Sequence, residues 1–393
     1  ENEKCIKQKL KYFSQLVETV DYEYEEIWLS DIVNKQFEVM VSVNLMQNNT
    51  IPSAQIATVD EIGLIDSTAM EHNILIYDLI IKLIRLFKGK YKPSQQIVNL
   101  LIAMLKCPSI KERTSVMSII NTIVDYYPEY AESITKKCFF LICEYLENKE
   151  EFFAIEFVLS FLQNRIVVTS GKFPVNMHEI IMAVTSLVSS PYLRFYSSKL
   201  ISFLTVLCIK YSMITKEIIL RLIKRFPLAN ISNQICIISF INKLLNYITK
   251  SQLMAIYVPL FRLYAKCARS VSWKVAKMSF EIWNIQKIRP YIAIIASNIY
   301  PTMYKSICDG IASDTNLRAP GSIALSEMSS INKNEYTKTL MNQKEAPIDK
   351  RIIGWKTIAG SAFDENGMTI MNDFKNAIGK IQEEYEKYLE YVY

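Results

Sequence analysis

Glycine and histidine are both scarce in this chain of 393 residues, which contains 9 glycines and 2 histidines. Glycine usually makes up about 7% of a protein. Phosphate-binding loops and the sharp turns that hold a catalytic nucleophile need glycine, because they require a positive φ angle or a close approach of the backbone. The scarcity therefore argues against an α/β enzyme built around such loops.

The common catalytic and metal-binding motifs are missing as well. The sequence contains no glycine-rich phosphate loop, no HExxH, no GxSxG, no kinase signature and no CxxC. His72 and His178 are the two histidines, and a lone histidine on a helix is more often structural than catalytic. We predict a protein without catalytic residues, metal or cofactor.

Long apolar runs are absent too, and the cysteines show no metal-ligand or disulfide spacing. The longest charge-free apolar runs, such as residues 200–209, are about half as long as a bilayer requires, so we expect no membrane insertion. Cys138 and Cys143 are the closest pair, and they lie in one apolar segment where buried thiols act as small hydrophobic groups. We therefore expect a reducing compartment, the cytoplasm or the nucleus.

The net charge of +6 is small for this length, and we interpret the basic residues as scattered along the sequence. The densest basic run, residues 82–92, is best interpreted as the solvated end of a helix. A protein that binds RNA through helical repeats needs a basic face with stacking aromatic side chains. We expect no nucleic-acid partner.

Helical periodicity is present almost everywhere, whereas alternating strand patterns of useful length are not found. Ile218, Ile219, Leu222 and Ile223 form a typical apolar stripe, and residues 74–87 are apolar nearly all round. Hydrophobic residues make up 50% of the chain, enough to form a large core. These patterns predict an all-α protein.

Prolines divide the helical segments at intervals of roughly thirty to fifty residues, a spacing typical of helical repeats. Each proline should stand where one helix ends and another begins. The positions are Pro93, Pro128, Pro174, Pro227, Pro259 and Pro290. We predict a HEAT-like or armadillo-like solenoid, a curved superhelix of about seven or eight helix pairs.

This solenoid should fill the whole chain, residues 1–393, in four segments. We expect N-terminal helices over residues 1–46, a loop with an acidic segment over 47–72, core repeats over 73–310 and C-terminal helices over 311–393. Within the last segment, residues 311–322 have the composition of a loop and residues 371–393 that of an acidic, tyrosine-rich helix. Trp273 and Trp283 are expected to pack in the core rather than to form a recognition site.

Several sequence blocks resemble the B-prime class of protein phosphatase 2A regulatory subunits. The strongest is PLFRLYAKCARSVSWKVAKMSFEIWN at residues 259–284, and EKCIKQKL, IKER (110–113), IYPTMY (299–304) and a helix around Trp355 agree in order. The resemblance implies a HEAT-like solenoid that binds a scaffold subunit and a catalytic serine/threonine phosphatase. It also implies a concave groove that recruits substrate or adaptor peptides.

The chain departs from that class where the class binds a Leu-x-x-Ile-x-Glu peptide. Members carry His-Arg-Ile-Tyr there, with an arginine seven residues later, whereas this chain has Asn121, Thr122, Ile123, Val124 and then Ala131. Losing the charged partners of the ligand glutamate costs about 2 to 5 kcal/mol. His178 matches a family histidine near the groove.

The resemblance therefore implies groove positions Asn121, Thr122, Val124, Ala131 and His178, with altered or lost recognition of the motif. The acidic loop that faces the phosphatase in the class corresponds loosely to residues 59–66. A HEAT-repeat adaptor for transport or trafficking remains the alternative, because the repeat pattern alone fits it equally well.

Overall fold

The computed structural model describes residues 3–45, 70–148 and 152–344. It separates into a first unit, Glu1–Asn332, and a second unit, Lys333–Tyr393. Every regular element in the described ranges is a helix, so the all-α prediction is confirmed. The second unit is described only for α18 (Lys333–Lys344).

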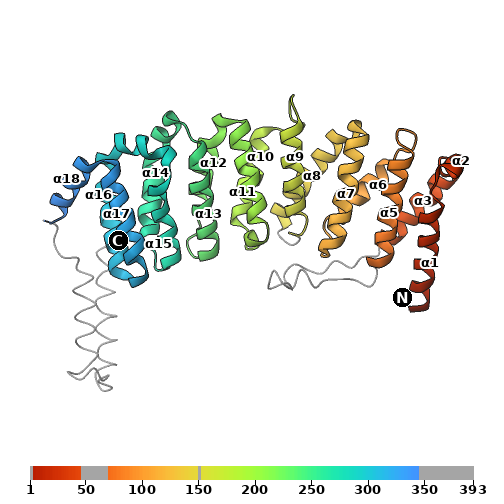
Figure 1. Cartoon of the computed structure of the whole chain (residues 1–393), viewed down its shortest axis with the longest axis horizontal. Coiled ribbons are helices and arrows are strands. Elements are labelled where there is room, and N and C mark those ends of the chain that lie inside the picture. Colours follow the sequence, from red (N-terminus) through yellow and green to blue (C-terminus); the bar gives the residue numbers. More distant parts are fainter. Residues whose placement is uncertain (1–2, 46–69, 149–151, 345–393) are drawn as a thin grey trace, which may run out of the picture. The chain divides into compact units, whose positions relative to one another are not determined.

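The helices of the first unit lie side by side in two rows, and each helix contacts the next helix of its own row (Figure 1). The first row consists of α1 (Glu3–Thr19), α5 (Met70–Leu86), α7 (Ile110–Tyr126), α9 (Ile155–Val168), α11 (Leu193–Lys210), α13 (Ile231–Leu244), α15 (Trp273–Phe280) and α17 (Arg318–Ile331). The second row consists of α3 (Asp31–Leu45), α6 (Gln95–Met104), α8 (Ala131–Asn148), α10 (Met177–Ser186), α12 (Thr215–Lys224), α14 (Lys250–Ala268) and α16 (Arg289–Ser313).

Successive helices alternate between the rows, so each helix pair adds one member to each row. This arrangement defines a helical-repeat solenoid, in which every repeat touches its neighbours only. The solenoid prediction is confirmed, and the described residues form seven pairs followed by α17. The bending of the array into a superhelix stays a prediction.

Short connectors, many of them single 3₁₀ turns, join the helices. They are η1 (Tyr22–Tyr24) with α2 (Glu25–Trp28), η3 (Pro128–Tyr130), η4 (Leu187–Ser189), η5 (Ser212–Ile214), η6 (Leu245–Tyr247), η7 (Glu281–Asn284), η8 (Gln286–Ile288) and η9 (Thr315–Leu317). Polar side chains then start the next helix. Thr249 and Gln252 form a reciprocal capping box at α14, and the Asn230 side chain accepts a hydrogen bond from the Asn233 amide at α13.

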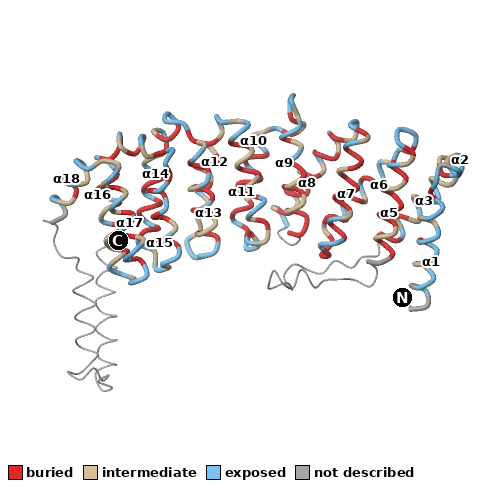
Figure 2. The backbone as a smooth tube through the Cα atoms, in the orientation of Figure 1, coloured by how far each residue is buried: buried red, intermediate tan, exposed pale blue. Residues whose placement is uncertain are grey.

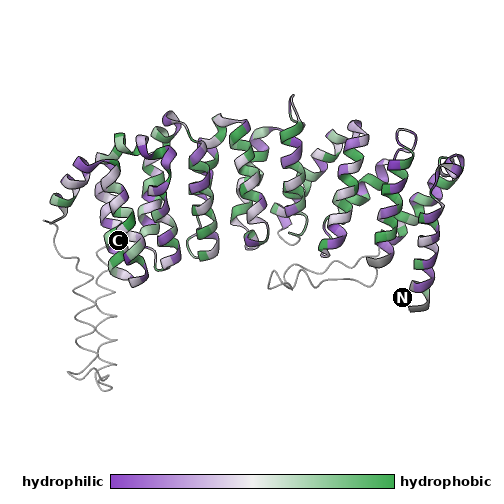
Figure 3. Cartoon of the chain, viewed as in Figure 1, coloured by the Kyte–Doolittle hydropathy of each residue, from purple (hydrophilic) through white to green (hydrophobic). Residues whose placement is uncertain are grey.

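The core is a continuous apolar layer between the two rows. Figure 2 shows buried residues along the helices from α5 to α17, and Figure 3 shows that apolar and polar residues alternate around the helices. The expected stripe on α12 is buried at Ile218, Ile219 and Leu222. Burial of such stripes is the main force that stabilises each repeat, at about 25 cal/mol per Å² of apolar surface.

A polar cluster lies inside this core where α5 meets α7. The Glu112 carboxylate is fully buried and accepts hydrogen bonds from Asn73 Nδ2 (2.9 Å), Tyr77 OH (2.7 Å) and Cys107 Sγ (2.8 Å). Burial and the neighbouring Glu112 raise the pKa of Cys107 to about 12. The cluster therefore fixes α5 against α7 through directional bonds in addition to apolar contacts.

Arg113, the next residue, is held between aromatic rings. Its guanidinium lies 5.4 Å from the Phe153 ring centre and 5.3 Å from that of Phe157. It also donates to the carbonyls of Cys107 and Pro108, both at 2.6 Å. Desolvation by burial lowers the Arg113 pKa to about 10. The IKER block thus has a structural role that links α7 to the start of α9.

One proline prediction is wrong, because Pro259 lies inside α14 rather than at a helix boundary. A proline in a helix removes one hydrogen bond and presses on the carbonyl four residues earlier. The surrounding α14 residues Ile256, Leu260, Leu263 and Tyr264 are buried, and this packing keeps the helix continuous. Tertiary burial has outweighed the local signal.

Residues 311–322 are mostly helical, so the loop expected there is also wrong. The helix α16 continues to Ser313, and α17 begins at Arg318 after the 3₁₀ turn η9. The Asp314 side chain accepts from the Asn316 amide at 2.8 Å and starts this turn. A Cβ on Gly321 would collide with Ile311, so this glycine allows α17 to approach α16 closely rather than making a loop flexible.

Helix α5 begins at Met70, within the predicted loop 47–72, and residues 47–69 lie outside the described ranges together with the acidic segment 59–66. His72 is buried and stacks on Phe13 of α1, which explains the earlier start. The acidic segment 371–393 and Trp355 also lie outside the described residues. The four-segment division otherwise stays a prediction.

The two tryptophans of the central block have different environments. Trp283 is fully buried and contacts the rings of Phe261 and Tyr300. Trp273 is 37% exposed at the start of α15. The core prediction is confirmed for Trp283 and is wrong for Trp273, since the first residue of a helix is only partly covered by its neighbours.

Candidate partner-binding surface

The second row presents an exposed stripe on each of its helices. On α8 the exposed residues include Phe140 and Glu147, and on α10 they include Glu179 and Met182. Because α6, α8, α10, α12, α14 and α16 contact one another in order, these stripes join into one surface that crosses successive repeats. Such a surface can hold an extended partner.

Most of the groove positions taken from the family resemblance are packed inside the array. Thr122 and Val124 on α7 and Ala131 at the start of α8 are buried, and Asn121 is half-buried. The Thr122 hydroxyl donates to the Ser118 carbonyl of its own helix at 2.8 Å. These four positions therefore offer no charged group to a ligand, and their part in binding stays a prediction.

His178 lies apart from them at the start of α10, with its side chain 63% exposed. Its backbone amide donates to the Asn176 side chain, which caps the helix. Its Nδ1 atom lies 3.5 Å from Glu217 of α12, and Glu217 also receives two hydrogen bonds from Arg221 at 2.9 and 2.7 Å. His178 thus belongs to a polar group that joins α10 to α12.

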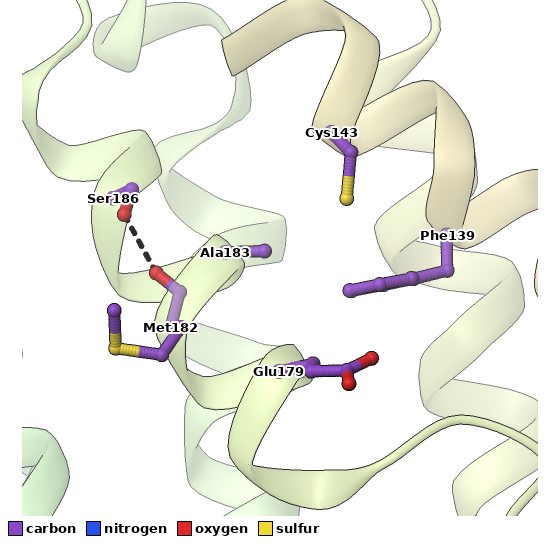
Figure 4. Close-up of a pocket in the computed structure, with 6 residues that line it drawn as sticks. All are labelled: Phe139, Cys143, Glu179, Met182, Ala183 and Ser186. Atoms are coloured by element: carbon purple, nitrogen blue, oxygen red, sulfur yellow. Dashed lines mark hydrogen bonds between the residues drawn. The ribbon is translucent and has the colours of Figure 1, made fainter. Parts of the chain in front are cut away.

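A shallow hollow of about 420 Å³ lies between α8 and α10, on the surface of the second row (Figure 4). Phe139 and Cys143 of α8 form one wall, and Glu179, Met182, Ala183 and Ser186 of α10 form the other. The Ser186 hydroxyl donates to the Met182 carbonyl, so it is already engaged within its own helix. The lining is largely apolar with one carboxylate at its edge.

The hollow was not foreseen from the sequence. Phe139 and Cys143 are four residues apart on α8, and Glu179, Met182 and Ser186 have the same helical spacing on α10. From the sequence, this spacing cannot be distinguished from that of an apolar stripe buried in the core, because both have a period of 3.6 residues. Only the packing of α8 beside α10 shows that these two stripes face solvent.

The charge along the array is uneven, contrary to the expected scatter. Residues 218–280 contain ten Lys or Arg residues and no Asp or Glu, which gives this stretch a net charge of +10. The whole chain has a net charge of +6, so the remaining residues together carry −4. The positive charge is therefore concentrated on α12, α13, α14 and α15.

Neither a metal site nor a membrane span is found in the part of the chain that the structure describes. No three His, Cys, Asp or Glu side chains in the described ranges are arranged to hold an ion. No helix among those residues is long and apolar enough to cross a membrane.

The two-row array and its exposed second row define the class of the protein, a helical-repeat protein. Residues 1–362 match the family described as "Protein phosphatase 2A regulatory B subunit (B56 family)". The match covers most of the chain, and the chain belongs to this family.

Individual relatives are distant. The chain is 21% identical over 324 residues to the B' theta isoform of the 57 kDa regulatory subunit from Arabidopsis thaliana, covering 77% of this chain and 64% of the relative. It is 20% identical over 282 residues to the beta isoform of the 56 kDa regulatory subunit from Oryctolagus cuniculus, covering 68% of this chain and 55% of the relative. A 98-residue stretch is 28% identical to the delta isoform of the 56 kDa regulatory subunit from Homo sapiens, covering 25% of this chain and 16% of the relative. The chain thus spans less than two thirds of these relatives.

Proposed function

We propose that this chain is a regulatory subunit of a protein phosphatase 2A holoenzyme, which binds the scaffold and catalytic subunits and recruits substrates. The observation that carries the proposal is the family match over residues 1–362. The two-row array supports it, since stacked helix pairs offer separate surfaces for rigid partners and for an extended peptide. The contribution of the chain is binding and orientation of a substrate, and the chemistry belongs to the catalytic subunit.

The array supplies this role through the exposed second row and the hollow between α8 and α10. Raising the local concentration of a substrate needs binding groups rather than catalytic groups. The chain itself is accordingly proposed to be non-catalytic. All eight cysteines are free thiols, which fits the proposed location in the cytoplasm or nucleus.

Assembly is tested by mixing the purified chain with a scaffold–catalytic dimer and following the three proteins by size-exclusion chromatography. We expect one complex that contains all three subunits and elutes before the dimer. A folded chain that elutes separately from the dimer at micromolar concentrations would contradict the proposal. That result would favour the alternative of a HEAT-repeat adaptor unrelated to phosphatase.

We further propose that recognition of the Leu-x-x-Ile-x-Glu motif is altered or lost in this chain. The family's basic positions are occupied by neutral residues, and Thr122, Val124 and Ala131 are buried. A glutamate brought to this place would lose its water shell without gaining a charged partner, at a cost of about 2 to 5 kcal/mol.

This second proposal is tested with a labelled peptide that carries the motif and with a control peptide in which alanine replaces the motif glutamate. We expect both peptides to bind the chain equally weakly. Low-micromolar binding that depends on the glutamate would refute the loss of recognition.

A further inference from the structure

The basic stretch on α12 to α15 includes side chains with no ionic partner. Arg262 and Lys266 lie four residues apart on α14, a spacing that places them on one helix face, and Arg269 follows directly after the end of this helix. All three are exposed. Lys224 of α12 and Lys305 of α16 are exposed as well. The salt bridges found in the described part of the chain involve none of these five residues.

Contacts between neighbouring repeats fix how far along its helix each of these residues lies. Asn298 Nδ2 of α16 is 3.4 Å from Tyr257 OH of α14, and Gly310 of α16 packs against the Ala268 carbonyl. Each residue of α16 therefore lies at the same height along the helices as the α14 residue about 41 positions earlier in the sequence. Gln252 of α14 donates to the Ser212 carbonyl, a separation of 40 residues. Lys224 and Lys305 are therefore both level with residue 264 of α14, between Arg262 and Lys266.

These four residues, Lys224, Arg262, Lys266 and Lys305, form a basic strip that crosses three adjacent helices of the second row. Neighbouring helix axes lie about 8 to 10 Å apart, so the strip is roughly 20 Å long. An extended chain advances about 3.3 Å per residue. About six residues of an extended peptide span the strip.

Apolar side chains border the basic strip on the side nearer the starts of the helices. Val258 of α14 is 39% exposed and Ile294 of α16 is 57% exposed, and Pro301 of α16 is also exposed. The hydrogen bond between Asn298 and Tyr257 shows that the two faces adjoin. The surface thus combines an apolar band with a parallel band of positive charge.

We infer that this surface of α12, α14 and α16 binds an acidic peptide segment of a partner protein that also carries apolar side chains. Its carboxylates would pair with Lys224, Arg262, Lys266 and Lys305, and its apolar side chains would cover Val258 and Ile294. Arginine suits this role, because its planar fork can hold a carboxylate through two hydrogen bonds.

A protein segment fits the surface better than a nucleic acid or a membrane. A strip that binds single-stranded nucleic acid uses exposed aromatic side chains as stacking platforms. The exposed apolar side chains that border this strip, Val258 and Ile294, are aliphatic, and the nearby Tyr257 is half-buried with its hydroxyl bonded to Asn298. A membrane-binding face presents a broad apolar side, whereas Val258 and Ile294 form a narrow band along a strip about six residues long. The inference does not depend on assembly with a phosphatase, since it concerns the isolated chain.

The test uses the full chain and a fluorescein-labelled peptide, Glu-Glu-Leu-Glu-Ile-Glu-Leu-Glu, followed by fluorescence anisotropy. The paired variant Arg262→Glu with Lys266→Glu reverses the centre of the strip. Lys172→Glu with Lys199→Glu is the matched control, because it changes the net charge equally at exposed positions outside α12, α14 and α16: Lys172 lies between α9 and α10, and Lys199 lies on α11. Lys305→Glu is a second variant should the first pair fail to fold by circular dichroism.

We expect binding to weaken at least tenfold in Arg262→Glu with Lys266→Glu, about threefold in Lys305→Glu, and less than twofold in the control. Replacing the peptide's glutamates by glutamine, or its leucine and isoleucine by serine, should each weaken binding several-fold. Binding should also weaken between 50 and 500 mM salt, because the charges are exposed.

Equal weakening by the control pair, or equal binding of the glutamine peptide, would overturn the inference. The alternative outcome is that the chain binds vesicles containing phosphatidylserine, or single-stranded RNA, more tightly than the peptide. If Arg262→Glu with Lys266→Glu abolished that binding, the result would overturn the inference in favour of a membrane or a nucleic acid. A gain in peptide affinity after Glu383, Glu384, Glu386 and Glu390 are changed to glutamine would show that the chain's own acidic end occupies the surface. That gain would also contradict the inference that the surface binds a segment of another protein.

Discussion

The Glu112 carboxylate is the polar centre of the α5–α7 contact, and its donors come from α5 and from the segment before α7. Asn73, Tyr77 and Cys107 all donate to it inside the core. We expect Glu112→Ala to lower the free energy of unfolding by about 3 kcal/mol or more, because it leaves buried donors without an acceptor. Glu112→Gln should cost about 1 kcal/mol, since its carbonyl can still accept from Asn73 and Tyr77.

Urea unfolding followed by circular dichroism measures both variants of this residue. Glu147→Ala, an exposed glutamate of α8, is the matched control and should change the free energy by less than about 0.5 kcal/mol. Similar losses in the alanine and glutamine variants would show that the negative charge, rather than the acceptor geometry, stabilises the contact.

The thiol of Cys138 is fully buried in α8, and burial raises its pKa from 9.0 to about 12. As the pH rises, the unfolded chain loses this proton first. The stabilisation from the neutral thiol is therefore complete below about pH 9 and is lost as the pH rises toward 12. Urea unfolding of the wild type and Cys138→Ala should show a stability difference that shrinks by about 1.4 kcal/mol per pH unit above pH 9. A constant difference would contradict the raised pKa.

The packing of α14 against α16 depends on a close backbone approach. A Cβ on Gly310 would overlap the Ala268 carbonyl oxygen, which belongs to the backbone and cannot rotate away. Gly310→Ala should therefore lower the free energy of unfolding by about 1 to 3 kcal/mol. Gly171→Ala, where a Cβ meets no atom within 4 Å, is the control and should be near neutral. Thermal unfolding separates the two, and equal midpoints would show that α16 shifts without cost.

Among the helices, the sequence was most informative where periodicity alone decides the structure. The apolar stripe of α12 predicts its buried face, and the helix-pair spacing predicts the array. The predictions of a helix boundary at Pro259 and of a loop over residues 311–322 were wrong. In both places packing outweighed a local signal for a helix end, within α14 in the first case and between α16 and α17 in the second. The hollow and the basic strip could not be predicted, since both depend on which helices become neighbours and at what level.

Among the residues that the structure describes, the main contacts between helices join adjacent repeats, which affects how local damage spreads. Asn73 and Tyr77 tie α5 to α7, Gln252 ties η5 to α14, and Tyr300 donates to the Met328 carbonyl of α17. Each bond links neighbours. The stability of such an array is close to a sum of repeat and interface contributions. The surfaces proposed to bind partners, on α8–α10 and on α12–α16, should therefore respond separately to mutation.

Hydrogen exchange tests this separation directly, with one destabilising variant near each end of the array. Glu112→Ala should reduce amide protection in α5, α6 and α7 by tenfold or more. Protection in α14 and α16 should stay within about twofold of the wild type, because the lost interface energy acts on neighbouring repeats first. Gly310→Ala should give the reverse pattern, with loss in α14, α16 and α17. The two variants are controls for each other, since each must spare the region that the other weakens. A uniform loss of protection across all helices in either variant would mean that the array unfolds as a single unit, and then a mutation in one binding surface would also weaken the other.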